Sequence, residues 1–189
     1  MTMTYQELLT SLKDKHKILI AGSQRSGTTI ATKMLANDLG YQDYYEEQIG
    51  SHWATARERF KRLCDNESNF VCQAPHLTAF CTEFDCDAVV FMARQFKDIE
   101  ESAKRIGWMK FENEEKEAFK TLDREEDGFV TEYFGKDFFN LPIWDIKKRF
   151  YAELTGDKYL ILNYSELKTH PLFITKEKRR NFHPRQTSL

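Results

Sequence analysis

Short apolar runs alternate along the chain with longer segments in which apolar residues recur every three or four positions. The runs contain no charged residue and read as strands buried on both faces of a parallel sheet. They cover residues 18–21, 70–72, 88–93 and 159–162. Residues 41–45 predict a further, weaker strand.

The segments between these runs have the periodicity of amphipathic helices. The predicted helices cover residues 4–14, 28–39, 51–63, 76–84, 97–105, 110–128 and 143–155, with a short turn at 165–168. Gly40 is expected to end the second helix, and Ser51 to cap the third. Alternating strands and helices predict one α/β domain: a three-layer fold with a mostly parallel β-sheet, flanked by helices and joined by right-handed crossovers.

Composition narrows the class of protein. The 189 residues are 41% hydrophobic and 31% charged, which is typical of a soluble globular domain. The formal net charge of −2 argues against broad binding to nucleic acid or membrane surfaces. The N-terminus has no signal-peptide pattern, and no stretch reaches the ~20 apolar residues of a membrane span, so we expect a cytoplasmic protein.

The other segments carry weaker signals. The cysteines lack zinc-site spacing, so free thiols and no metal site are expected. They are Cys64, Cys72, Cys81 and Cys86. The acid-rich stretch 110–128 predicts a solvated helix face. The aromatic stretch 129–143 fits a lid or substrate wall, or core packing between helices, which we favour. The basic tail 175–189 is expected to be disordered.

The sharpest candidate for chemistry is the loop between the first strand and its helix, residues 22–29. Gly22 and Gly27 permit a tight turn, and the following helix N-terminus offers free N–H groups and a favourable dipole to an anion. Thr28 stands where nucleotide-triphosphatase loops place the lysine that reaches the β- and γ-phosphates, and Arg25 is the loop's cation. The loop therefore predicts a phosphate or sulfate site without the usual group for a magnesium triphosphate. An ordinary strand–turn–helix connection is the alternative.

Other polar residues follow the ends of the predicted strands. Because ligands of parallel sheets bind beyond the carboxyl ends of the strands, we expect these residues to converge on one crevice. They are Arg25, Glu46, Glu47, Gln73, His76 and Arg94.

Several stretches, in this order and spacing, resemble the sulfotransferases that use 3′-phosphoadenosine 5′-phosphosulfate. Residues 22–29 (GSQRSGTT) are similar to the family's 5′-phosphosulfate loop, with Gln24 in place of a common proline. Residues 94–102 resemble its 3′-phosphate motif, an Arg after a central strand and a Ser eight residues on, but lack the usual proline at position 96. Residues 70–77 and 159–171 resemble the segment before that strand and the family's late strand with its Tyr-x-x-Leu turn.

The resemblance covers roughly residues 17–107 and 158–173 and implies a P-loop nucleoside triphosphate hydrolase-like fold of sulfotransferase type. It implies transfer of a sulfuryl group from 3′-phosphoadenosine 5′-phosphosulfate, without a metal, to a hydroxyl or amine of a small-molecule or peptide acceptor. The implied co-substrate contacts are Gln24, Arg25, Ser26, Gly27, Thr28, Thr29, Arg94 and Ser102. Without the resemblance, Arg94 reads as an ion-pair partner of Asp98, and Ser102 as an ordinary helix-surface residue.

Sulfuryl transfer also calls for a general base. Glu46 and Glu47 resemble the acidic pair of protein-tyrosine sulfotransferases, in which one member is the base. Arg25 would neutralise charge on the leaving oxygen. His76 and His52 stay open as bases, because other branches of the family use a histidine.

Two other functions remain open at this stage. Gln73 stands where many family members carry a catalytic lysine, which leaves a non-catalytic nucleotide-binding module possible unless Lys33 or a tail lysine substitutes. A small-molecule or nucleotide kinase is the third hypothesis, and the missing loop lysine argues against it.

Overall fold

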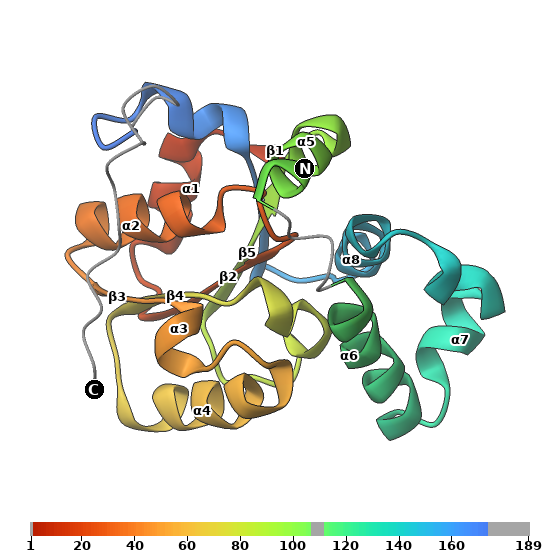
Figure 1. The fold of residues 1–189 in the computed structure, drawn as a ribbon. Helices are drawn as coiled ribbons and strands as arrows, with labels where there is room; N and C mark the ends of the chain where they lie inside the picture. Colours follow the sequence, from red (N-terminus) through yellow and green to blue (C-terminus); the bar gives the residue numbers. More distant parts are fainter. Residues whose placement is uncertain (1, 107–111, 174–189) are drawn as a thin grey trace.

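The computed structural model describes residues 2–106 and 112–173. In that part of the chain a sheet of six strands, all parallel, has the order β1-β6-β5-β2-β4-β3 (Figure 1). The strands are β1 (Thr2–Met3), β2 (Lys17–Gly22), β3 (Gln42–Tyr44), β4 (Phe70–Gln73), β5 (Ala88–Ala93) and β6 (Tyr159–Asn163). The predicted α/β class with a parallel sheet is confirmed. The two-residue edge strand β1 was not predicted, because so short a segment has no apolar run.

Most of the predicted helices are present. The α-helices are α1 (Tyr5–Leu12), α2 (Thr28–Leu39), α3 (Glu46–Ile49), α4 (Trp53–Asn66), α5 (Phe96–Ile106), α6 (Glu112–Glu125), α7 (Phe129–Phe134) and α8 (Ile143–Ala152). The 3₁₀ turns are η1 (Pro75–Phe80), η3 (Lys136–Asn140) and η4 (Tyr164–Thr169). Of these, α3, α7 and η3 lie in segments for which no helix was predicted. Gly40 ends α2 in the left-handed conformation, with φ +70°, as predicted.

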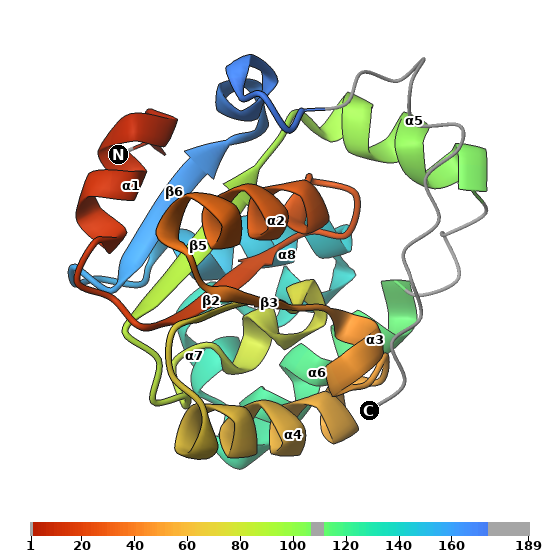
Figure 2. The same ribbon diagram turned by 90° about the vertical axis from the view of Figure 1, so that its left-hand side faces the viewer.

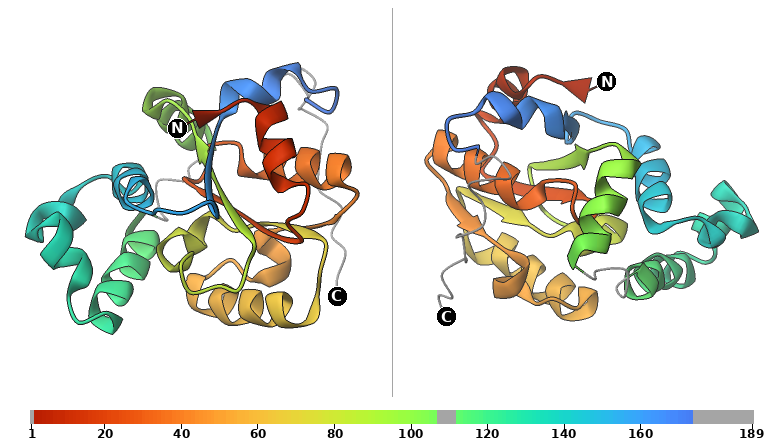
Figure 3. Two further views of the ribbon diagram at one scale, coloured as in Figure 1. Left: turned by 180° about the vertical axis from the view of Figure 1, so that it is seen from behind. Right: turned by 45° about the horizontal axis from the view of Figure 1, so that its top comes forward.

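The sheet is covered on both faces, which gives the predicted three layers. Figure 2 shows α2 and α4 on opposite sides of the strands. One hydrophobic core joins α1, α2 and η4 to alternate strand residues such as Ile18 and Val90. The other joins α4, η1, α6 and α8 to the intervening residues, such as Leu19 and Val89. Figure 3 shows α7 at the far end of the molecule from α1 and α2.

Two of the predicted helices, 51–63 and 76–84, differ clearly from the structure. Residues 46–49 form the separate helix α3. The Tyr45 N–H before this helix donates to the Gln48 side chain, which caps the first turn. Ser51 therefore lies in the link between two helices, and the cap of α4 is His52, which accepts a hydrogen bond from the Ala54 N–H. The predicted helix 76–84 is instead the shorter 3₁₀ turn η1.

The aromatic stretch before α8 mostly packs in the core, as favoured. Phe138 is buried and stacks on Phe134 with ring centroids 4.4 Å apart. Phe129 and Tyr133 on α7 remain exposed. The basic tail 175–189 lies outside the described residues. Over the described ranges, no helix is both long enough and apolar enough to cross a membrane.

The register of the sheet aligns the carboxyl ends of its central strands. Gly22 of β2 pairs with Met92 of β5, so Arg94 emerges beside the loop. On the other side Ile20 pairs with Gln73 of β4. The chain runs to one side of β2 for β3 and β4 and to the other for β5 and β6, which makes the end of β2 a topological switch point, where ligands of such sheets bind.

Candidate functional site at the carboxyl end of β2

The loop 22–27 leaves β2 with a backbone that its glycines permit. Gly22 has φ +127°, and a Cβ there would lie 3.0 Å from the Met92 carbonyl oxygen. Gly27 caps α2 with φ +102° and no side-chain cap. Arg25, although not a glycine, also has a positive φ of +66°. A non-glycine residue held in this region is strained by order 1 kcal/mol and commonly marks a functional segment.

The loop's polar groups divide into those used inside it and those facing outward. Ser26 is fully buried, and both its N–H and its hydroxyl donate to the Ser23 carbonyl, at 3.1 and 2.7 Å. Thr28 is buried too, and its hydroxyl accepts from the Gln73 amide at 3.3 Å. Thr29 is exposed. Gly27 has no side chain to cap α2, so the N–H groups in the first turn of α2 are suited to bind an anion.

Two guanidinium groups from separate elements meet at this loop. Arg94, just after β5, donates from Nη1 to the Arg25 carbonyl oxygen at 2.9 Å. Arg25 in turn donates from Nε to the Ser102 hydroxyl on α5 at 3.1 Å. The expected Asp98 contact is also present, with Arg94 Nε 3.7 Å from Asp98 Oδ2. The predicted convergence of Arg25, Arg94 and Ser102 is therefore present in the structure, and Arg94 braces the strained residue of the loop.

Tyr164 completes this side of the site. Its ring lies under the Arg94 guanidinium, 4.2 Å from Cζ to the ring centroid, at a distance typical of a cation–π contact. A Cβ on Gly27 would lie 2.4 Å from Cδ2 of the same ring. Tyr164 directly follows β6, whose residue Asn163 pairs with Ala93. The ring therefore packs between the loop and the arginine and holds both.

Glu46 and His76 lie on the other side of the loop. Glu46, the first residue of α3, accepts from the Gln24 amide at 3.0 Å, and its Oε2 lies 3.6 Å from Nδ1 of His76. That distance is too long for a hydrogen bond. Both ring nitrogens of His76 are buried without a hydrogen-bond partner, while Glu47 points to solvent. The structure thus separates the predicted acidic pair and brings Glu46, Gln24 and His76 together.

The Glu46 carboxyl lies in a mixed environment. Burial raises its pKa, but the contacts with His76 and Gln24 and the charge of Lys147 outweigh burial, so its pKa lies below the usual range. Glu46 is consequently ionised at neutral pH and able to accept a proton. His52, the other candidate base, instead caps α4.

Sequence reasoning missed a buried ion pair behind the loop. Lys147 on α8 is 1% exposed, and its Nζ lies 2.5 Å from Glu115 Oε2 on α6. The prediction that the whole acid-rich stretch is a solvated face is wrong at this residue, because Glu115 is buried beside Ala118 and Phe119. The signal was present: both charges occupy positions three or four residues from apolar core residues of an amphipathic helix.

A small cavity of about 50 Å³ opens beside the loop, toward α5, α6 and α8. Its lining combines polar residues of the loop with apolar side chains of the helices. These include Gln24, Arg25, Ile99, Glu115, Ile143 and Trp144. Phe96 stacks on Trp144 nearby, with ring centroids 4.0 Å apart. The predicted base Glu46 does not line this cavity; Gln24 lies between the two.

Comparison with known proteins adds the following. No protein-family model matches the chain. No curated protein sequence matches it either. Among solved structures, the chain is similar to shikimate kinase from Acinetobacter baumannii in complex with shikimate, at 16% sequence identity and a TM-score of 0.42, over 66% of this chain and 83% of that one. The P-loop-like character of the fold rests on the chain's own strand–glycine loop–helix unit at the centre of a parallel sheet.

Proposed function

We propose that the chain binds 3′-phosphoadenosine 5′-phosphosulfate at the carboxyl end of β2 and transfers its sulfuryl group to a hydroxyl or amine acceptor. The observation that carries the proposal is the meeting of Arg25, Arg94 and Ser102 at a glycine loop. Arg94 reaches the Arg25 carbonyl at 2.9 Å, and Arg25 reaches Ser102 at 3.1 Å. An arginine of the loop, together with a second arginine that contacts its backbone, suits a ligand with an anionic group at each end.

The roles follow from this placement. The first turn of α2 and Arg25 hold the 5′-phosphosulfate. Arg94 has five N–H donors, so its bond to the loop leaves others for the 3′-phosphate, which the Ser102 hydroxyl also approaches. A local anion site of this kind agrees with a net charge of −2 for the whole chain.

In the reaction the acceptor oxygen or nitrogen forms a bond to sulfur while the bond from sulfur to the bridging phosphate oxygen breaks. Negative charge grows on that oxygen, where Arg25 and the loop N–H groups stabilise it. The acceptor's proton passes to Glu46, which its low pKa keeps ionised. The Gln24 amide, which donates to Glu46 at 3.0 Å, positions the carboxylate, and His76 lies 3.6 Å from it. 3′-Phosphoadenosine 5′-phosphate is the other product.

A non-catalytic nucleotide-binding module is the second candidate, favoured by one contact. The Gln73 amide, at the position where many sulfotransferases carry a lysine, donates to the Thr28 hydroxyl at 3.3 Å. A neutral amide there supports the loop without adding charge to help the leaving group.

Calorimetry followed by a transfer assay separates these candidates. We expect 3′-phosphoadenosine 5′-phosphate to bind at least about tenfold more tightly than ATP with magnesium, a difference of about 1.4 kcal/mol. Tighter binding of magnesium ATP would contradict the proposal and favour a kinase. Transfer of radiolabelled sulfate to an acceptor library then supports the enzyme, and nucleotide binding without any transfer supports the module.

A further inference from the structure

The buried ammonium group of Lys147 makes three contacts that together use all its N–H donors. Its Nζ donates to the carbonyl oxygen of Gly22 at 3.1 Å and to that of Pro75 at 2.8 Å. The third partner is the Glu115 carboxylate, at 2.5 Å. At 1% exposure the group has no access to solvent, so these contacts fix its position.

The two carbonyls belong to the two segments that build the site. Gly22 is the last residue of β2, where the anion loop begins. Pro75 follows β4 and directly precedes His76. Thr78 reinforces the same junction, since its hydroxyl accepts from the Gly22 N–H at 3.2 Å and donates to the Pro75 carbonyl at 2.7 Å. Lys147 thus connects the start of the loop to the segment that contains His76, the neighbour of Glu46.

Burying an ion pair in a core costs free energy, because both charges lose their hydration. Two apolar side chains of similar volume commonly give equal or greater stability. An apolar residue at position 147, however, would leave the carbonyls of Gly22 and Pro75 without this donor. The charge also contributes to keeping the pKa of Glu46 low. The Lys147–Glu115 pair is therefore better explained by its restraint on the segments of Gly22 and Pro75 than by a contribution to stability.

We propose that Lys147, itself held by Glu115, is a positioning residue that fixes the start of the anion loop against the His76 segment. It thereby sets the distance between a bound sulfuryl group and Glu46. The catalytic half of this inference rests on the proposed function. The structural half, the restraint on the loop, does not.

The test uses the double variant Lys147→Met/Glu115→Leu, which removes both charges so that neither is left alone in the core. Lys148→Met, an exposed neighbour on the same helix, is the matched control. Hydrogen exchange comes first. We expect the amides of Gly22 and Ser26 to lose at least about tenfold in protection in the double variant, with the β5 amides unchanged. Unchanged loop protection would overturn the proposal, whether or not any nucleotide binds.

Kinetics of sulfate transfer come second. We expect kcat to fall by about 100-fold in the double variant with a much smaller change in KM, because a small misplacement of reacting groups slows chemistry more than it weakens binding. Wild-type kcat in a variant whose loop exchanges faster would refute the positioning role in catalysis. No transfer by the wild-type protein would count against the proposed function, and the exchange result would still decide the restraint on the loop.

Discussion

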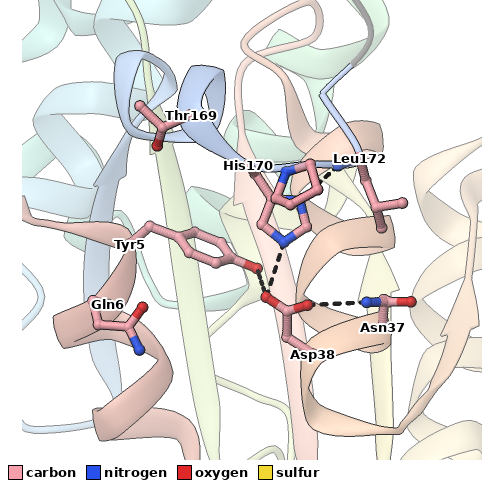
Figure 4. A pocket seen from close by; sticks show the side chains of 8 residues that line it. Tyr5, Gln6, Asn37, Asp38, Thr169, His170 and Leu172 are labelled. Atoms are coloured by element: carbon pink, nitrogen blue, oxygen red, sulfur yellow. Dashed lines mark hydrogen bonds and ion pairs between the residues drawn. The ribbon is translucent and has the colours of Figure 1, made fainter.

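Two regions of this molecule bring a histidine close to a carboxylate, and they satisfy the histidine in opposite ways. In the hollow between α1, α2 and η4, His170 uses both ring nitrogens: Nε2 lies 2.9 Å from Asp38 Oδ2, and Nδ1 accepts from the Leu172 N–H at 3.1 Å (Figure 4). At the carboxyl end of β2, His76 is 3.6 Å from Glu46, and neither ring nitrogen has a hydrogen-bond partner.

The Asp38 carboxylate has further hydrogen-bond partners besides His170. The Tyr5 hydroxyl donates to it at 3.0 Å and the Asn37 amide at 3.0 Å (Figure 4). Burial, followed by the neighbouring Asp38 charge, raises the pKa of Tyr5, so its hydroxyl stays a donor. These contacts join α1, α2 and the end of η4.

The hollow around Asp38 measures about 450 Å³, and the cavity beside the anion loop about 50 Å³. The hollow around Asp38 is thus the larger of the two by volume. Buried polar atoms without partners are uncommon in folded proteins, and each calls for an explanation. At the end of β2, by contrast, both ring nitrogens of His76 and Nε of Arg94 are buried without a hydrogen-bond partner, and this is why we place the proposed site there.

The largest expected effect is on turnover. Glu46→Gln should lower sulfate transfer by about 100-fold or more, because general bases contribute about 10²–10⁴-fold. Glu47→Gln, one residue further along and exposed, is the matched control and should retain activity. Initial rates with a labelled donor provide the measurement. Loss of activity in Glu47→Gln alone would reverse the assignment.

The next effect concerns the packing of the loop. Gly27→Ala should lower the free energy of unfolding by about 1–3 kcal/mol more than Gly156→Ala, as expected for overpacking. Both glycines have a positive φ, +102° and +108°, but only Gly27 faces a ring, that of Tyr164, within 4 Å. The difference between the two variants therefore isolates the ring contact. Urea unfolding measures it, and equal losses would show that Tyr164 does not constrain the loop.

The two histidines should respond differently to removal. His170→Ala should cost about 1–3 kcal/mol of unfolding free energy, because Asp38 loses a donor. His76→Leu should cost less, since it removes ring nitrogens that have no hydrogen-bond partner and loses only the weaker contact with Glu46. It should nevertheless reduce sulfate transfer. A greater loss of stability in His76→Leu than in His170→Ala would refute the contrast between the regions.

The smallest effect is a pH dependence of stability. Burial raises the pKa of Asp38, but the donors Asn37, His170 and Tyr5 outweigh it, so the folded-state pKa lies below the usual value. Its stabilising contribution is therefore present above about pH 4, the unfolded value, and is lost as pH falls through the folded pKa. In Asp38→Asn, the fall of Tm on acidification should be shallower. An identical acid limb would contradict this.

Much of the site could be predicted because strand ends are readable in a sequence. Apolar runs locate the strands, and parallel strands align their carboxyl ends, so Arg25 and Arg94 had to emerge at one edge. The sequence also predicted the 12-residue helix α2 and its end at Gly40. Local signals of this kind need no knowledge of distant contacts.

The parts that could not be predicted depend on side-chain direction and on long-range pairing. Adjacent acids look alike in a sequence, and the start of α3 turns Glu46 inward and Glu47 outward. Lys147 lies 125 residues from Gly22, the carbonyl that it contacts. Its place on the apolar face of α8 marks it as buried, but no local pattern names its partners.

The central claim is that one nucleotide spans two cationic contacts. The most direct test is calorimetry with 3′-phosphoadenosine 5′-phosphate and AMP, which differ only in the 3′-phosphate, on wild type, Arg94→Ala and the exposed control Arg105→Ala. We predict that the wild type and Arg105→Ala prefer the bisphosphate by about 100-fold, near 2.7 kcal/mol, and that Arg94→Ala loses most of this preference. The ratio of the two affinities cancels any general weakening of the loop. An undiminished preference in Arg94→Ala would contradict the account.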